Sequence, residues 1–220
     1  MNTIIELQNV SFAYKKNETQ CEPLFLDSID LPIGEYSLVF LFGESGAGKS
    51  SLLRLINGLE SPTSGDIYFH GKKLKTLDPC LLRQKISLLQ QVPVMFPMTV
   101  EENLNLSPGA AQISLKEKKE ILNSLGLNDN CLHKIATELS IGQAQRVAFA
   151  RCLMNRPEAM LLDEPTASLD KKNKMVLFET IMKYTRENKM TVLWITHDSS
   201  LIEEYPFKKF QLKDKKIYEI

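Results

Sequence analysis

The fold is decided by the stretch Leu38-Val39-Phe40-Leu41-Phe42-Gly43-Glu44-Ser45-Gly46-Ala47-Gly48-Lys49-Ser50. Its first five residues are all apolar, which is typical of a strand buried on both faces of a sheet. Three glycines follow, and the residues after them place leucines and an isoleucine at helical spacing. The sequence therefore predicts a strand over Tyr36–Phe42, a glycine-rich loop, and a helix over Lys49–Leu59 that ends at Ser61-Pro62.

The loop itself has the spacing of a phosphate-binding motif. Residues 43–50 match the pattern G-x-x-x-x-G-K-[ST], and the expected strand and helix supply the context that this motif requires. Glycines let backbone N–H groups turn inward around phosphate oxygens, and the positive end of the following helix points at the same anion. We expect Lys49 to reach the β- and γ-phosphates and the Ser50 hydroxyl to bind Mg²⁺.

Two further strand ends carry side chains that suit a nucleotide site. The apolar run Met160–Leu162 leads into Asp163 and Glu164, at the sheet edge where open α/β folds bind ligands. Asp163 is the candidate magnesium ligand, and Glu164 is the candidate general base that orients an attacking water. His197 closes another apolar strand and can reach the same edge, although a single histidine is more often structural.

Length and composition limit the number of domains and the classes of protein to which the chain can belong. The chain has 220 residues, which corresponds to one domain or to one domain with an inserted subdomain. It carries 27 basic and 27 acidic residues, so nothing indicates nucleic-acid binding as its main function. The longest apolar run, Leu38–Phe42, is too short to span a membrane, and the N-terminus does not read as a secretory signal. Four scattered cysteines without a Cys-x-x-Cys pair argue against a metal site or disulfides and fit a reducing cytosol.

The N-terminal part reads as antiparallel strands. We expect strands over Ile4–Val10 and Leu24–Leu31, a turn at Pro32–Gly34, and a strand over Asp66–His70. The α/β pattern returns near the other end of the chain. There we expect a strand over Ala159–Leu162, a helix over Lys171–Asn188, a strand over Thr191–Thr196, and a hairpin of Phe207–Leu212 and Lys215–Ile220 that turns at Lys213-Asp214.

The middle of the chain, from about Pro93 to Pro157, has a helical pattern. Its helices have clear start signals, because Thr99, Ser114 and Ser140 are each followed three residues later by Glu or Gln. Gly126 is expected to end the helix that Ser114 begins, and the helix that Ser140 begins should run to Asn155. Strands and helices at both ends with helices between them predict an α/β core with a helical subdomain.

Further motifs, in matching order and spacing, resemble those of the nucleotide-binding subunits of ABC transporters. Leu139-Ser140-Ile141-Gly142-Gln143 is similar to the family signature LSGGQ, Leu161–Thr166 to its Walker B region, Ala167-Ser168-Leu169-Asp170 to its D-loop, and Ile195–Asp198 to its switch-histidine segment. The resemblance extends over essentially the whole chain. It implies a P-loop NTPase core with a mixed central sheet and an N-terminal antiparallel β subdomain over residues 1–90 and 158–220, and an inserted helical (signature) subdomain over about 91–157.

The resemblance also implies the residue roles of an ATPase. Tyr14 would stack on adenine, with Phe12 as the other platform, and Gln91, rather than Gln90, would sense the γ-phosphate, which His197 would also contact. The implied catalytic residues are Glu164, His197, Gln91 and Lys49. The implied ATP contacts are Tyr14, Gly43, Glu44, Ser45, Gly46, Ala47, Gly48, Lys49, Ser50, Ser51, Ser140, Gly142 and Gln143. The implied Mg²⁺ ligands are Ser50, Gln91 and Asp163.

Such ATPases pair head to tail, so that each ATP lies on one subunit's phosphate loop and against the other subunit's signature. Ser140 would cap a helix whose positive end suits a γ-phosphate from a second copy, and Gly142 would let backbone approach closely. The chain departs from the family at Ile141, where the signature has glycine. A β-branched residue tolerates helical dihedrals, so we expect the helix start to survive, while its bulk could weaken the trans contact.

These features predict an ATP-hydrolysing subunit that powers solute movement through a separate permease, from the cytoplasmic face of the cell membrane. The alternative is a soluble ABC-type ATPase that acts on a nucleic-acid or ribosomal machine. The interval between Lys49 and Asp163 is too short for the long coiled coils of chromosome-type relatives, and ribosome-type relatives usually carry two ATPase units. The chain also has a weak likeness to the small ATPases of metal (iron) exporters. Because this likeness is weak, the sequence leaves the substrate and the direction of transport open.

Overall fold

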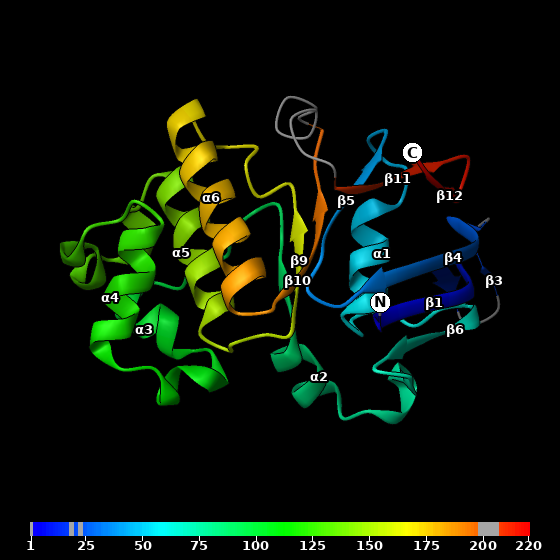
Figure 1. The fold of residues 1–220 in the computed structure, drawn as a ribbon, viewed down its shortest axis with the longest axis horizontal. Coiled ribbons are helices and arrows are strands. Elements are labelled where there is room, and N and C mark those ends of the chain that lie inside the picture. Colours follow the sequence, from blue (N-terminus) through cyan, green and yellow to red (C-terminus); the bar gives the residue numbers. More distant parts are fainter. Residues whose placement is uncertain (1, 18–19, 22–23, 198–206) are drawn as a thin grey trace. The chain divides into compact units, whose positions relative to one another are not determined.

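The computed structural model describes residues 2–17, 20–21, 24–197 and 207–220 (Figure 1). The chain forms two compact units, the first made of Met1–Arg83 and Thr191–Ile220 and the second of Gln84–Met190. It passes from the first to the second within helix α2 (Pro79–Lys85), which was not predicted. The predicted boundaries of the helical subdomain at 91 and 157 stay a prediction.

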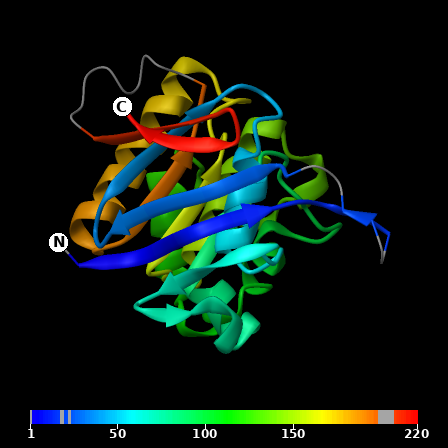
Figure 2. The ribbon, with the colours of Figure 1, turned by 90° about the vertical axis from the view of Figure 1, so that its right-hand side faces the viewer.

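An antiparallel sheet in the first unit has the order β4-β1-β6-β7. Its strands are β4 (Leu26–Gly34), β1 (Thr3–Phe12), β6 (Ser64–Phe69) and β7 (Lys72–Lys73), and the blue and cyan arrows of Figure 2 show the first three side by side. A short hairpin of β2 (Lys15–Asn17) and β3 (Gln20–Cys21) follows β1. The predicted antiparallel N-terminal part is thus confirmed.

The predicted turn at Pro32–Gly34 is wrong. Pro32 pairs with Glu6, β4 continues to Gly34, and the chain turns at Glu35 and Tyr36 instead, where Tyr36 has a φ of 56°. The physical reason is that β4 is an outer strand of this sheet. A proline at a sheet edge lacks only an N–H that no further strand of that sheet requires.

A second group of strands in the first unit carries the glycine-rich loop. β5 (Leu38–Gly43) runs parallel to both β10 (Thr191–Ile195) and β11 (Lys208–Lys213), and β11 pairs antiparallel with β12 (Lys216–Glu219). This mixture of parallel and antiparallel pairs confirms the predicted α/β architecture. The β11–β12 turn lies at Asp214 and Lys215, both at positive φ, which is one residue later than predicted.

Helix α1 (Lys49–Ile56) follows β5 as predicted, but it is shorter than expected. It ends because Asn57 is its C-cap and Gly58 takes a left-handed φ of 69°, a conformation that terminates helices. The predicted end at Leu59 is therefore wrong, and Ser61-Pro62 lies beyond the real stop. The 3-10 helix η1 (Leu74–Thr76) comes later in the same unit.

The second unit begins with two parallel strands, β8 (Ile86–Leu89) and β9 (Ala159–Asp163), and β8 was not predicted. Between and after them come the α-helices α3 (Val100–Asn105), α4 (Leu115–Ser124), α5 (Ile141–Leu153) and α6 (Lys171–Glu187), with the 3-10 helices η2 (Pro108–Gln112), η3 (Asp129–His133) and η4 (Ala136–Glu138). The predicted helical insertion is confirmed, with α5 ending two residues early.

The predicted helix starts are confirmed, although the capping box predicted at Ser114 has only its serine half. Thr99 and Ser140 each form both hydrogen bonds of a capping box, and the Ser114 side chain accepts from the Glu117 N–H. Gly126 follows α4 with a φ of 69°, as a residue just past a helix end should. Across the described part of the chain, no helix is both long and apolar enough to cross a membrane.

Two glycines of the antiparallel sheet region provide a test of this backbone geometry. Both have a left-handed backbone, with a φ of 80° at Gly65 and 71° at Gly71. A Cβ on Gly65 would lie 2.3 Å from the Asn9 carbonyl oxygen, whereas a Cβ on Gly71 would meet nothing within 4 Å. Of these two glycines, Gly65 alone therefore combines a left-handed backbone with a close approach of another strand.

We expect Gly71→Ala to lower the free energy of unfolding by about 1 kcal/mol, the cost of a left-handed L-residue. Gly65→Ala should lower it clearly more, because the Asn9 backbone must also move. Urea unfolding followed by circular dichroism measures both. Equal losses in the two variants would contradict the close approach at Gly65.

Candidate functional site

The phosphate loop has a backbone that three glycines make possible. Gly43, Gly46 and Gly48 take φ values of 153°, 80° and 108°, which L-residues with side chains rarely adopt. A Cβ on Gly43 would lie 2.5 Å from the carbonyl oxygen of Leu212 in the neighbouring strand β11. Gly43 is thus required both by its dihedral angle and by the strand beside it.

Lys49 lies at the centre of this loop. Its side chain is 6% exposed, and its Nζ donates to the carbonyl oxygens of Gly43 and Glu44, each at 2.8 Å. The loop therefore curls around the ammonium group, which is held at a defined place by backbone oxygens. An ammonium group held in this way is positioned to interact with phosphate oxygens.

The start of α1 is suited to an anion. Its N-cap, Gly48, has no side chain to accept from the first N–H groups, and the first turn contains no acidic residue. Helix geometry leaves those N–H groups without carbonyl partners inside the helix, and the helix dipole adds positive potential there. The loop and the helix start therefore fit the phosphates of a nucleotide.

Tyr14 lies beside the same helix. Its hydroxyl shares a hydrogen bond of 2.7 Å with the hydroxyl of Ser51, and its ring makes edge contacts with Phe12 and Phe25. A cavity of about 600 Å³ adjoins Tyr14, and its lining residues are Phe12, Ala13, Tyr14, Leu59, Glu60, Ser61, Pro62 and Thr63. The structure thus links two predicted ATP contacts, Tyr14 and Ser51, while stacking on adenine stays a prediction.

In the second unit, the structure brings Gln91 and Glu164 together. The Gln91 side-chain amide donates to a Glu164 carboxylate oxygen at 3.3 Å. Leu89 and Leu162 are partners in the parallel pair β8–β9, so the residues two positions beyond each of them leave the same edge side by side. This register explains how two residues far apart in the sequence meet.

Asp163 and Glu164 have different environments. Asp163 is the last residue of β9 and is 8% exposed, whereas Glu164 is half-buried and has a φ of 48°. Non-glycine residues in a left-handed conformation cost free energy and concentrate at functional sites. The sequence carries no signal for this conformation, which turns the chain immediately after the strand.

His197 follows β10 in the first unit and is exposed. Asp198, the last residue of the predicted switch-histidine segment, lies outside the described residues.

The start of α5 has the geometry expected for the signature. Ser140 Oγ accepts from the Gln143 N–H at 3.3 Å, and Gln143 Oε1 accepts from the Ser140 N–H at 3.1 Å. The N–H groups of Ile141 and Gly142 lie at the helix start, where no intrahelical carbonyl can reach them. The Ile141 side chain is 68% exposed, so the helix start survives the departure from the family and faces solvent.

Gly142 has a second role that the sequence did not reveal. A Cβ there would lie 3.2 Å from a Leu169 methyl group and 3.5 Å from the Ser168 carbonyl oxygen. The missing side chain of Gly142 therefore lets the D-loop segment, Ala167–Asp170, pack directly on the first turn of α5.

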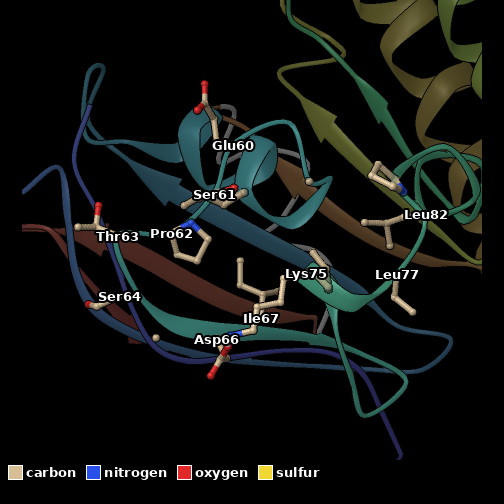
Figure 3. A pocket seen from close by; sticks show the side chains of 15 residues that line it. Glu60, Ser61, Pro62, Thr63, Ser64, Asp66, Ile67, Lys75, Leu77 and Leu82 are labelled. Atoms are coloured by element: carbon tan, nitrogen blue, oxygen red, sulfur yellow. Dashed lines mark hydrogen bonds and ion pairs between the residues drawn. The ribbon is translucent and has the colours of Figure 1, made fainter. Parts of the chain in front are cut away.

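A separate cavity of about 480 Å³ opens in the first unit beside the end of α1 (Figure 3). Leu55, Ile67 and Leu82 form part of its apolar lining. Asp66 lies at its edge and makes ion pairs of 2.8 Å with both Lys73 and Lys75. None of the predicted site residues lines this cavity.

Comparisons with known proteins agree with this geometry. A family model described as ABC transporter matches residues 26–167. The probable iron export ATP-binding protein FetA of Escherichia coli K12 is 38% identical, over 90% of this chain and 87% of that protein. The lipoprotein-releasing system ATP-binding protein LolD of Rickettsia bellii is 35% identical, over 96% of each.

Among solved structures, the ATP-binding cassette MJ0796, described as a dimer in a post-hydrolysis state bound to ADP and Pi, superimposes with a TM-score of 0.87 at 32% identity. The match covers 99% of this chain and 98% of that one. Sequence motifs, fold and relatives thus point the same way, and the chain belongs to the ABC transporter family as an ATP-binding, ATP-hydrolysing subunit.

Proposed function

We propose that two copies of this chain pair head to tail around ATP, each ATP lying between the phosphate loop of one copy and the start of α5 of the other. The observation that carries the proposal is the start of α5, which is capped by Ser140 and exposed at Ile141. Its remaining N–H groups and its positive end are available to a γ-phosphate from outside. A relative of similar fold is described as a dimer bound to ADP and Pi, which supports pairing of nucleotide-bound copies.

Within each copy, different residues bind the phosphates, the adenine ring and Mg²⁺. Lys49 neutralises the β- and γ-phosphate oxygens, and Tyr14 supports the adenine ring. Mg²⁺, held by Ser50, Asp163 and Gln91, would neutralise the charge that develops on the phosphates. This donor set of hydroxyl, carboxylate and amide oxygens is of the kind that Mg²⁺ prefers.

Glu164 then acts on the water that attacks the γ-phosphorus. Its carboxylate orients this water and accepts a proton as the new P–O bond forms and the bond to ADP breaks. The 3.3 Å contact from Gln91 holds that carboxylate in place, and His197 contacts the γ-phosphate. Release of phosphate removes the charge that the α5 start of the partner copy binds, which weakens the pair.

In this proposal the subunit lies in the cytoplasm, on the inner face of the membrane, and drives a separate permease. Relatives named for iron export, lipoprotein release and methionine import are 38%, 35% and 37% identical. These identities are too close to favour one substrate, and in this proposal the separate permease selects it. Metal (iron) export is the activity to test first, and co-purification from membranes identifies the permease.

Lys49→Ala should weaken ATP binding by about 100-fold, because charge-assisted contacts to two phosphates are lost. Isothermal titration with ATP and Mg²⁺ measures this loss. Lys75→Ala is the control, since it removes an exposed lysine of the same unit that pairs with Asp66. Tight binding by Lys49→Ala would remove this lysine from its assigned role.

Glu164→Gln should keep ATP binding, abolish turnover and trap a dimer, because the amide cannot accept the proton of the attacking water. Gel filtration with and without ATP measures the oligomeric state, and phosphate release measures turnover. A variant that binds ATP yet stays monomeric would argue against head-to-tail pairing.

Ile141→Gly in the Glu164→Gln background tests the departure from the family signature. If the exposed side chain crowds the trans phosphate, the glycine variant should form the dimer at several-fold lower ATP concentration. Leu115→Gly is the matched control, because Leu115 is also an exposed apolar residue directly after a serine N-cap, at the start of α4. If both variants form the dimer at the same ATP concentration, the Ile141 side chain does not weaken pairing.

A further inference from the structure

A buried arginine joins the signature helix to two other elements of the second unit. Arg146, on α5, is 7% exposed, and its Nε donates to the Gly142 carbonyl oxygen at 3.1 Å. Its Nη1 lies within 3.2 Å of the carbonyl oxygens of Leu125 and Gly126, at the end of α4. The same Nη1 donates to the side-chain oxygen of Asn173, on α6, at 2.9 Å.

Asn173 connects this arginine to the end of the D-loop segment. Its side-chain NH₂ donates to one carboxylate oxygen of Asp170 at 2.8 Å, and its backbone N–H donates to the other at 2.8 Å. These hydrogen bonds, with a smaller contribution from Arg146, hold the pKa of Asp170 below its usual range, so the carboxyl group is ionised at neutral pH. The amide thus lies between a cation and an anion.

A planar amide in that position has one favourable orientation. Its oxygen must face the guanidinium group and its NH₂ must face the carboxylate, since a flipped amide would oppose donor to donor and acceptor to acceptor. The contact therefore fixes both the distance and the direction between Arg146 and Asp170. Few other side chains offer an acceptor and a donor on one group of this size.

The segment that ends at Asp170 is the one that packs on Gly142. Leu169 is 7% exposed and lies against the first turn of α5, whereas Ser168 is exposed. Arg146 is bonded to the Gly142 carbonyl oxygen, one turn before it on α5. The packing of Leu169 at Gly142 and the hydrogen bonds that link Asp170 through Asn173 to Arg146 thus both connect the D-loop segment to α5.

We propose that Asn173 is a positioning residue whose amide, held between Arg146 and Asp170, sets the D-loop segment Ala167–Asp170 in register with the start of α5. In this proposal Asn173 acts through Arg146 and Asp170, which its side chain contacts, and has no assigned contact with nucleotide or magnesium. Its effect on ATP-driven pairing rests on the proposed function, because a second copy must then meet the D-loop segment and the helix start together.

The positioning itself can be measured without nucleotide. Hydrogen–deuterium exchange of the whole protein reports on the Ala167 and Leu169 N–H groups, which donate to the carbonyl oxygens of Glu164 and Thr166, just before the segment, at 3.1 Å each. Asn173→Ala should accelerate exchange in this segment several-fold. The matched control is Asn123→Ala, which also removes an asparagine that donates to an aspartate, Asp129, at 2.9 Å in the same unit. Unchanged exchange in Asn173→Ala would overturn the proposal.

The consequence for pairing is measured in the Glu164→Gln background. Asn173→Ala should raise the ATP concentration needed for half-maximal dimer about fivefold or more, with the ATP affinity of the monomer and the thermal midpoint close to those of Asn123→Ala. A parallel loss of monomer affinity and thermal midpoint would show a merely structural role and overturn the proposal.

Asn173→Asp tests the contact with Asp170 separately from the contact with Arg146. It keeps an acceptor for Arg146 but sets a carboxylate against Asp170, so dimer formation should fall at least as far as in Asn173→Ala. Parent-like pairing of Asn173→Asp would overturn the link to Asp170. If the Glu164→Gln parent itself does not pair, the proposed function fails, and the exchange measurement alone decides whether Asn173 positions the segment.

Discussion

The phosphate loop depends on a backbone path that only residues without a Cβ follow at low cost. Gly43 must pass the Leu212 carbonyl oxygen and take a φ of 153°, and this path directs the carbonyl groups of Gly43 and Glu44 onto the Lys49 ammonium. The helix start that follows is left without a side-chain cap. The close packing of β5 against β11 and the uncapped start of α1 therefore both follow from the same backbone geometry.

In the second unit, strand register brings together side chains that lie far apart in the sequence. Because β8 and β9 are parallel and in a fixed register, Gln91 and Glu164 leave the same edge together. The D-loop segment continues from that edge and reaches α5 where Gly142 leaves room for Leu169. Residues of three separate motifs are thus placed by one pair of strands and one missing side chain.

Much of this arrangement could be predicted from sequence because its signals are local. Capping boxes at Thr99 and Ser140 mark helix starts within four residues, and an apolar run before glycines marks a buried strand. The features that the sequence did not predict depend on residues far away in the chain. Pro32 lies in a strand only because that strand is at a sheet edge, and the amide of Asn173 acquires its role only when Arg146 and Asp170 come to either side of it.

The left-handed backbone at Glu164 has a consequence for how this position can be altered. Its φ of 48° means that part of the direction of the carboxylate is set by main-chain torsion rather than by side-chain rotamers. An amide of the same length inherits that torsion unchanged, so it alters chemistry alone. Glycine would relax the torsion, and a β-branched residue would aggravate it, so substitutions of either kind would confound reactivity with a new chain trajectory.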